Sequence, residues 1–269
     1  MSPLIALLLL TGPAFEHRKQ TLPYSAEWGQ YRVVVEHYKP QPTVDEIDDA
    51  PMRIRIADQR GHTLKEVRDY YITSVKSASI TAKGAQDLIV HTYSGGAYSS
   101  NTTLIFTKTG GLRNILHFSG IHLSLDEARD LNHDGRAELI GQSPALREFS
   151  GWSFSRCKPI DVIFQWQGHH LVDVTSRFPA EIMKGDRAEF LRDLKESEWA
   201  IQGAITGYYP NMHKVGRDAE ARKFLKKHLS KSLYSWFRRY QTELNQAVER
   251  SKRVMVDNRK VIDLNLDNP

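Results

Sequence analysis

The most informative segment of the chain is residues 130–140, which read DLNHDGRAELI. The segment has the pattern D-x-N-x-D-G-x-x-E followed by apolar residues. Acidic and amide side chains at alternating positions supply oxygen atoms, and calcium takes about six to eight oxygen ligands. The glycine lets the backbone turn back over an ion. We therefore predict a calcium-binding loop in this segment.

Five residues of the loop are the predicted ligands of one structural Ca²⁺ ion. Four supply side-chain oxygens and one supplies its backbone carbonyl; in chain order they are Asp130, Asn132, Asp134, Arg136 (through its carbonyl) and Glu138. An EF-hand is excluded, because it needs a bidentate Glu at loop position 12 and a helix on each side. Position 12 is Gly141 and both flanks have strand composition. The alternative is a turn without an ion, held by Asx hydrogen bonds.

The sequence around the loop predicts a mainly β fold built from antiparallel repeats. Alternating or β-branched apolar residues predict strands at 30–38, 52–57, 63–71, 72–80, 88–90, 103–106, 112–118 and 121–128. Aligning Gly84 with Gly135 gives an offset of 51 residues and also aligns Asp87 with Glu138. A third, partial copy begins near Asp161. Repeats of about 40–50 residues with four short strands are typical of propeller blades, and so few copies predict an open or partial propeller.

The pattern D-x-N-x-D-G-x-x-E-L-I resembles the calcium loop of FG-GAP or VCBS-type repeats, found in the propellers of integrin α subunits and in many secreted bacterial proteins. The resemblance implies that the loop joins two strands of one blade and that the five residues named above are the ligands. It also implies a single loaded loop, because the earlier copy has Ser79, Thr81 and Lys83 at the ligand positions. Residues 87–106 are similar to a segment of small exported bacterial proteins of unknown role, without the His-Cys-Cys run found there.

The character of the sequence changes after Pro179. Apolar residues recur at helical spacing from about 186 to 208 and again from 218 to 248. Pro210 is expected to end the first helix, because it removes a backbone donor. We predict an antiparallel helical hairpin at 185–258, after a β-repeat domain at 24–180.

The N-terminal residues 1–14 are interpreted as a signal peptide, which predicts a secreted or periplasmic protein. Residues 4–10 are apolar, and Gly12 and Ala14 have the spacing of a cleavage site. The alternative is a hydrophobic arm buried in the fold. The apolar stretch is far shorter than the roughly 20 residues that span a bilayer, so no transmembrane segment is expected.

The single cysteine, Cys157, permits no intramolecular disulfide and is expected to be buried and unreactive.

Positive charge is concentrated near the C-terminus. The chain has a formal net charge of +5, yet residues 214–260 contain 14 Lys and Arg against 5 Asp and Glu. The residues predicted to meet an anionic polymer or membrane surface are Lys226, Lys227, Lys231, Arg238 and Arg239. The simpler alternative is the solvated outer face of a packed helix. Sequence-specific nucleic-acid binding is not expected.

No catalytic motif of the H-E-x-x-H, G-x-S-x-G or Walker type is present, so no catalytic residue is assigned. We predict an exported, calcium-stabilised β-repeat protein that binds an unidentified protein or polysaccharide. One alternative is an envelope hydrolase or hydrolase inhibitor with a cleft lined by Tyr93, Tyr98, Trp152 and Trp166. The other alternative is a protein that binds anionic surfaces through the basic C-terminal helix.

Overall fold

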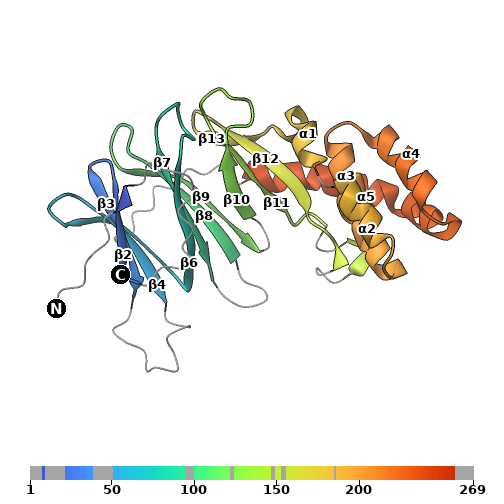
Figure 1. Cartoon of the computed structure of the whole chain (residues 1–269), viewed down its shortest axis with the longest axis horizontal. Helices are drawn as coiled ribbons and strands as arrows, with labels where there is room; N and C mark the ends of the chain where they lie inside the picture. Colours follow the sequence, from blue (N-terminus) through green and yellow to red (C-terminus); the bar gives the residue numbers. More distant parts are fainter. Residues whose placement is uncertain are drawn as a thin grey trace. The chain divides into compact units, whose positions relative to one another are not determined.

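The computed structural model describes residues 8–9, 22–38, 51–94, 100–121, 124–146, 149–152, 156–184 and 186–257. These residues form three successive antiparallel sheets followed by helices (Figure 1). The internal contacts divide them into two compact units. The first unit comprises the described residues up to Ser124 together with Asp134–Arg136. The second comprises Leu125–His133 and the described residues from Ala137 onward.

The first unit contains two sheets with simple up-and-down connections. The first sheet consists of β1 (Leu8–Leu9), β2 (Tyr24–Trp28), β3 (Tyr31–His37), β4 (Met52–Ala57) and β5 (Thr63–Asp69). The second sheet consists of β6 (Tyr71–Ala78), β7 (Asp87–Tyr93), β8 (Ser100–Thr107) and β9 (Arg113–Ile121). Neighbouring strands are antiparallel, except that the two-residue β1 pairs in parallel with β2. The remaining residues of the predicted signal peptide lie outside the described residues.

Alternation along the strands determines which side chains form the core of the first unit. In β4, Ile54 and Ile56 are buried, while Arg53 and Arg55 point to the other face. The two sheets share one apolar cluster, which includes Trp28, Val33, Val35, Ile54, Val75, Val90, Leu104 and Phe106. β7 is buried on both faces over most of its length, which explains its continuous apolar run at 88–90.

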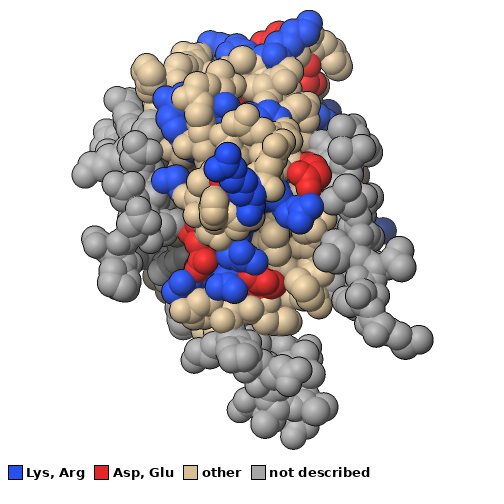
Figure 2. Space-filling view, turned by 90° about the vertical axis from the view of Figure 1, so that its left-hand side faces the viewer, with Lys and Arg blue, Asp and Glu red and all other residues tan. Residues whose placement is uncertain are grey.

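The outward face of the first sheet carries charges that are largely paired. Arg53 and Arg55 both donate to Glu36, at 2.8 and 2.7 Å, and Arg68 pairs with Glu66. Figure 2 shows basic and acidic side chains mixed on this side of the molecule. Three arginines therefore share two glutamates, which compensates much of the positive charge of this face.

The second unit contains the third sheet and the helices. The sheet consists of β10 (Ser124–Arg129), β11 (Glu138–Ser143), β12 (Ile160–Gln167) and β13 (His170–Asp173). The helices are the 3₁₀ turns η3 (Phe149–Gly151) and η5 (Thr175–Arg177), then α1 (Pro179–Ile182), α2 (Asp186–Asp193), α3 (Glu198–Lys214), α4 (Asp218–His228) and α5 (Lys231–Asp257). The described strands form no closed propeller. No helix in the described ranges is both long and apolar enough to cross a membrane.

The predicted β repeats are confirmed as three four-stranded sheets if the short β1 is set aside. β2 was not predicted, because apolar and polar residues alternate only weakly along Tyr24–Trp28. It is fixed by pairing with β3, with Trp28 opposite Tyr31 across a turn in which Gly29 has a φ of +65°. A positive φ favours glycine at this turn.

The predicted hairpin of two helices is wrong, because four helices, α2 to α5, occupy the region in place of two. A serine begins a new helix at each unexpected break. Ser197 accepts a hydrogen bond from the Ala200 N–H, and Ser230 accepts one from the Leu233 N–H, both at 3.3 Å. Serine is a strong N-cap, because its hydroxyl satisfies a backbone donor that the first turn leaves free.

Pro210 does not end α3, contrary to the prediction. The helix continues to Lys214. A proline inside a helix costs about 3 kcal/mol. The neighbouring Tyr209 and Met212 are 0% exposed, and burying such side chains contributes about 1.5–3 kcal/mol each. The free energy gained by burying these side chains therefore outweighs the backbone hydrogen bond lost at Pro210. As a result, Asn211 lies within α3.

Candidate functional site

The loop between β10 and β11 has a structural counterpart between β6 and β7. The first loop separates residues 78 and 87 and the second separates residues 129 and 138, so both strand boundaries are 51 residues apart. Gly84 and Gly135 occupy the same place in the two loops, and their φ angles are +75° and +89°. The 51-residue offset predicted from the sequence is therefore present in the fold.

A fully buried carboxylate closes each loop. Asp87 accepts hydrogen bonds from the backbone N–H groups of Ile80 and Thr81, at 3.0 and 2.7 Å, and from the Thr81 hydroxyl at 2.9 Å. Glu138 accepts from the N–H of Leu131 at 2.9 Å, and Leu131 is the residue 51 positions after Ile80. Both carboxylates are on residues with 0% exposure. The repeat thus preserves a hydrogen bond as well as a strand pattern.

The predicted calcium ligands lie along this loop with different exposures. Asn132 and Asp134 are exposed, Asp130 and Arg136 are partly exposed, and Glu138 is buried. Asp134 accepts a hydrogen bond from the Arg136 N–H at 2.8 Å, and its other oxygen lies 3.6 Å from the Arg136 guanidinium.

The second oxygen of Glu138 accepts a hydrogen bond from Gln165 at 3.2 Å. Within the described ranges, no three His, Cys, Asp or Glu side chains converge as a metal cluster. The donor chemistry of the loop nevertheless suits Ca²⁺, because all predicted ligand atoms are oxygens and each carboxylate oxygen has a second lone pair.

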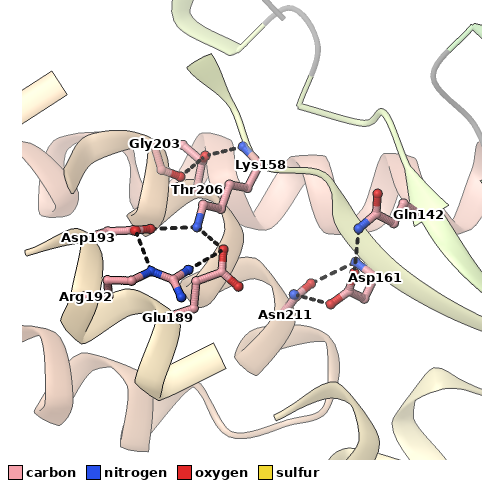
Figure 3. A network of polar contacts seen from close by, with 9 residues as sticks. All are labelled: Gln142, Lys158, Asp161, Glu189, Arg192, Asp193, Gly203, Thr206 and Asn211. Atoms are coloured by element: carbon pink, nitrogen blue, oxygen red, sulfur yellow. Dashed lines mark hydrogen bonds and ion pairs between the residues drawn. The ribbon is translucent and has the colours of Figure 1, made fainter. Parts of the chain in front are cut away.

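A second group of polar side chains, which the sequence did not reveal, lines a pocket of about 280 Å³ in the second unit. Its polar walls are formed by Gln142, Lys158, Asp161, Glu189 and Asn211. Figure 3 shows that these residues come from β11, from the start of β12 and the segment before it, and from α2 and α3. The remaining walls are formed by Pro159, Phe190, Ala204, Gly207 and Tyr208.

Two hydrogen bonds hold the segment that enters β12 along α3. The Lys158 N–H donates to the Thr206 hydroxyl at 3.1 Å, and the Asp161 N–H donates to the Asn211 side-chain oxygen at 3.0 Å (Figure 3). Thr206 is itself oriented by donating to a backbone carbonyl within α3. These bonds fix the positions from which the Lys158 and Asp161 side chains project.

Lys158 is held between two carboxylates of α2. Its Nζ lies 2.5 Å from Glu189 and 2.7 Å from Asp193 (Figure 3). Burial opposes the charged form, but the hydrogen bonds to Asp193 and Glu189 prevail and raise the pKa of Lys158 above its usual value. The ammonium group is therefore charged and already neutralised by its neighbours.

The two carboxylate oxygens of Asp161 are hydrogen-bonded unequally. Its Oδ2 accepts from the Asn211 amide at 2.9 Å, whereas its Oδ1 has a longer contact, 3.4 Å, with the Gln142 amide. Burial raises the pKa of Asp161 above its usual value, and the two amide hydrogen bonds oppose this shift only in part. Because the Gln142 contact is long, Oδ1 can accept a hydrogen bond from a ligand.

The basic residues predicted to meet an anionic partner are all exposed on α4 and α5. They are Lys226, Lys227, Lys231, Arg238 and Arg239. Among the described residues, none of the five lies within ion-pair distance of a carboxylate, whereas Arg217 and Arg222 of the same region are paired with Glu220 and Asp218.

The aromatic residues of the predicted hydrolase cleft contribute to packing. Trp152 stacks on Trp236 with ring centroids 5.4 Å apart, and Trp166 is 5% exposed. Tyr93 packs on Tyr71 at 6.0 Å. Tyr98 lies outside the described residues. Each described member of this set therefore packs within its own unit.

Cys157 is buried, as predicted, and burial raises its pKa to about 11. The thiol is therefore a poor nucleophile at neutral pH.

Comparisons with protein-family models, with curated proteins and with solved structures give no match to this chain.

Proposed function

We propose that this chain is an exported binding protein in which propeller-blade-like sheets are stabilised by one calcium ion in the 130–138 loop. The ion would be held by Asp130, Asn132, Asp134, the carbonyl of Arg136 and Glu138. By neutralising the acidic side chains it would fix the β10–β11 connection, so that the sheets present a rigid surface to a protein or polysaccharide partner. Extracellular calcium modules bind with a Kd of about 10⁻⁴–10⁻³ M, so even a weak loop is loaded outside the cell.

The proposal is supported by a difference between the two equivalent loops. In the first loop, Asp87 is satisfied by two backbone donors and a hydroxyl, and Lys83 stands where the second loop has Asp134. The second loop instead carries two further acidic residues beside the buried Glu138. Like charges brought close together disfavour ionisation, and a bound cation removes this penalty. The first loop has the composition of one that closes without an ion, whereas the second has the composition of one that uses an ion.

Calcium titration of the thermal melting temperature tests the proposal. We expect added Ca²⁺ to raise the melting temperature, because a ligand that binds only the folded state stabilises it, and we expect a chelator to reverse the rise. Asp134→Ala should abolish the calcium-dependent rise. Asp126→Ala, at an exposed acidic position in the neighbouring strand, is the matched control and should retain it. A melting temperature that responds to neither calcium nor chelator rejects a structural ion.

A second candidate function is binding of an anionic polymer or membrane surface through α4 and α5. It is supported by the five exposed basic side chains that have no carboxylate partner among the described residues. Such side chains attract polyanions mainly through charge, so this binding would weaken steeply as salt increases.

A further inference from the structure

We infer that the pocket formed by the 158–161 segment, α2 and α3 binds a small neutral ligand that carries several hydroxyl groups, such as one sugar ring. This inference goes beyond the proposed function, because it uses neither the calcium loop nor the basic helices. All residues that line the pocket belong to the second unit.

The charge balance of the pocket favours a neutral ligand over an ion. Lys158 is neutralised by Glu189 and Asp193, and Arg192 lies 4.0 Å from each of the same two carboxylates (Figure 3). The two cations therefore compensate the two α2 carboxylates. Only Asp161 adds a further negative charge, and its oxygens accept hydrogen bonds from the Asn211 and Gln142 amides. An anionic ligand would be repelled by this carboxylate, and a multiply charged cation would find one uncompensated partner only.

The hydrogen-bonding groups of the pocket suit hydroxyl groups. Asp161 offers Oδ1 as an acceptor, and Glu189 offers a half-exposed carboxylate at 48% side-chain exposure. Gln142 adds an exposed amide, which both donates and accepts. A hydroxyl group also donates and accepts, so neighbouring hydroxyls on a ring can use a mixed set of this kind, whereas an ammonium group can only donate.

The size and remaining walls of the pocket are consistent with a single small ring. Its volume of about 280 Å³ lies just below the range of about 300–1,000 Å³ that is usual for drug-sized ligands. Phe190, Ala204 and Gly207 form the apolar part of the lining. An apolar wall facing a few polar groups is the usual arrangement in a small-molecule site, and it suits the C–H face of a sugar.

The experiment uses the full chain and ligand-observed NMR with a panel of neutral monosaccharides at millimolar concentration, followed by calorimetric titration of any binder. A glycan array tests whether the same sugar is recognised at the end of a chain. We expect saturable binding of at least one sugar. Asp161→Asn keeps the partner of Asn211 but weakens the ligand acceptor, so it should reduce affinity by about tenfold, as expected for loss of a hydrogen bond to a charged group.

Glu189→Gln provides an independent variant at a half-exposed position, and Glu196→Gln is the matched control on an exposed residue between α2 and α3. The inference is supported if Glu189→Gln also weakens binding, Glu196→Gln does not, and circular dichroism shows that all variants are folded. It is overturned if no sugar binds, or if binding persists unchanged in both pocket variants. A calcium-dependent melting temperature without sugar binding would leave the proposed function standing and remove this inference alone.

Discussion

At the scale of single residues, buried carboxylates define the repeat more clearly than the exposed acidic residues do. Asp87 and Glu138 begin equivalent strands, and each accepts a backbone N–H from the start of its loop. A buried backbone donor needs a partner, so a carboxylate at this position stabilises the loop whether or not an ion is present. This explains why the acidic residue persists in the first loop, where the other predicted ligand positions hold Ser79, Thr81 and Lys83.

Asp87→Ala should lower the free energy of unfolding by about 3 kcal/mol, because it leaves two backbone donors of Ile80 and Thr81 without their acceptor. Urea denaturation measures the change. Asp58 also accepts two backbone N–H groups, but in an exposed turn where water can replace it, so Asp58→Ala is the control and should have a smaller effect. Equal effects for the two variants would show that burial does not matter for this contact.

At the scale of the elements, α3 is the element around which the second unit is built. Gly203 and Gly207 lie one turn apart on the side that faces the segment 156–158. A Cβ at Gly203 would lie only 2.6 Å from the backbone carbonyl oxygen of Arg156. These glycines therefore permit the close approach that allows Asn211, two turns after Gly203, to bond with Asp161.

Gly203→Ala should destabilise the protein by about 1–3 kcal/mol, the usual range for overpacking, because the contact is with backbone and cannot be relieved by a side-chain rotation. Alanine has the higher helix propensity, so a stabilising effect would contradict the close packing described here. Thermal and urea denaturation measure the change. Ser235→Ala, at an exposed position of α5, is the control and should change stability little.

At the scale of the whole molecule, the uneven charge of the chain is partly cancelled by folding. Lys214 is 7% exposed and lies 3.0 Å from Asp173, and Arg217 and Arg222 are paired with Glu220 and Asp218 of α4. The cations that remain exposed are concentrated at the end of α4 and the first turns of α5. This concentration, rather than the net charge of the chain, is what an anionic surface would meet.

Replacing Lys226 and Lys227 together by glutamine should weaken retention on heparin and binding to anionic vesicles. The slope of log affinity against log salt should fall by roughly one for each lysine removed, if each meets one anionic group. Lys184→Gln together with Lys195→Gln removes the same charge from other exposed positions and is the control. Equal losses for the two double variants would assign the binding to net charge alone.

Patterns of residues close together in the sequence were sufficient to predict much of the fold. Alternation predicted most strands, and the aligned glycines and acidic residues gave the 51-residue offset that the loops preserve. These features depend on interactions between residues close together in the chain or on the period of a strand, which the sequence states directly. The number of helices was not predictable in this way. Each of the two predicted helices is divided in two where a serine, Ser197 or Ser230, caps the start of a new helix.

The polar pocket required the tertiary structure. Asp161 and Asn211 are 50 positions apart, and their contact exists only because buried neighbours carry α3 past Pro210 and two glycines admit the adjoining segment. Propensity at Pro210 predicts the opposite outcome, and only the summed burial of the surrounding helix reverses it. The calcium-type loop can be found from its residues alone because its predicted ligands lie at alternating positions within nine residues of the chain. The pocket cannot, because its residues become neighbours only through packing.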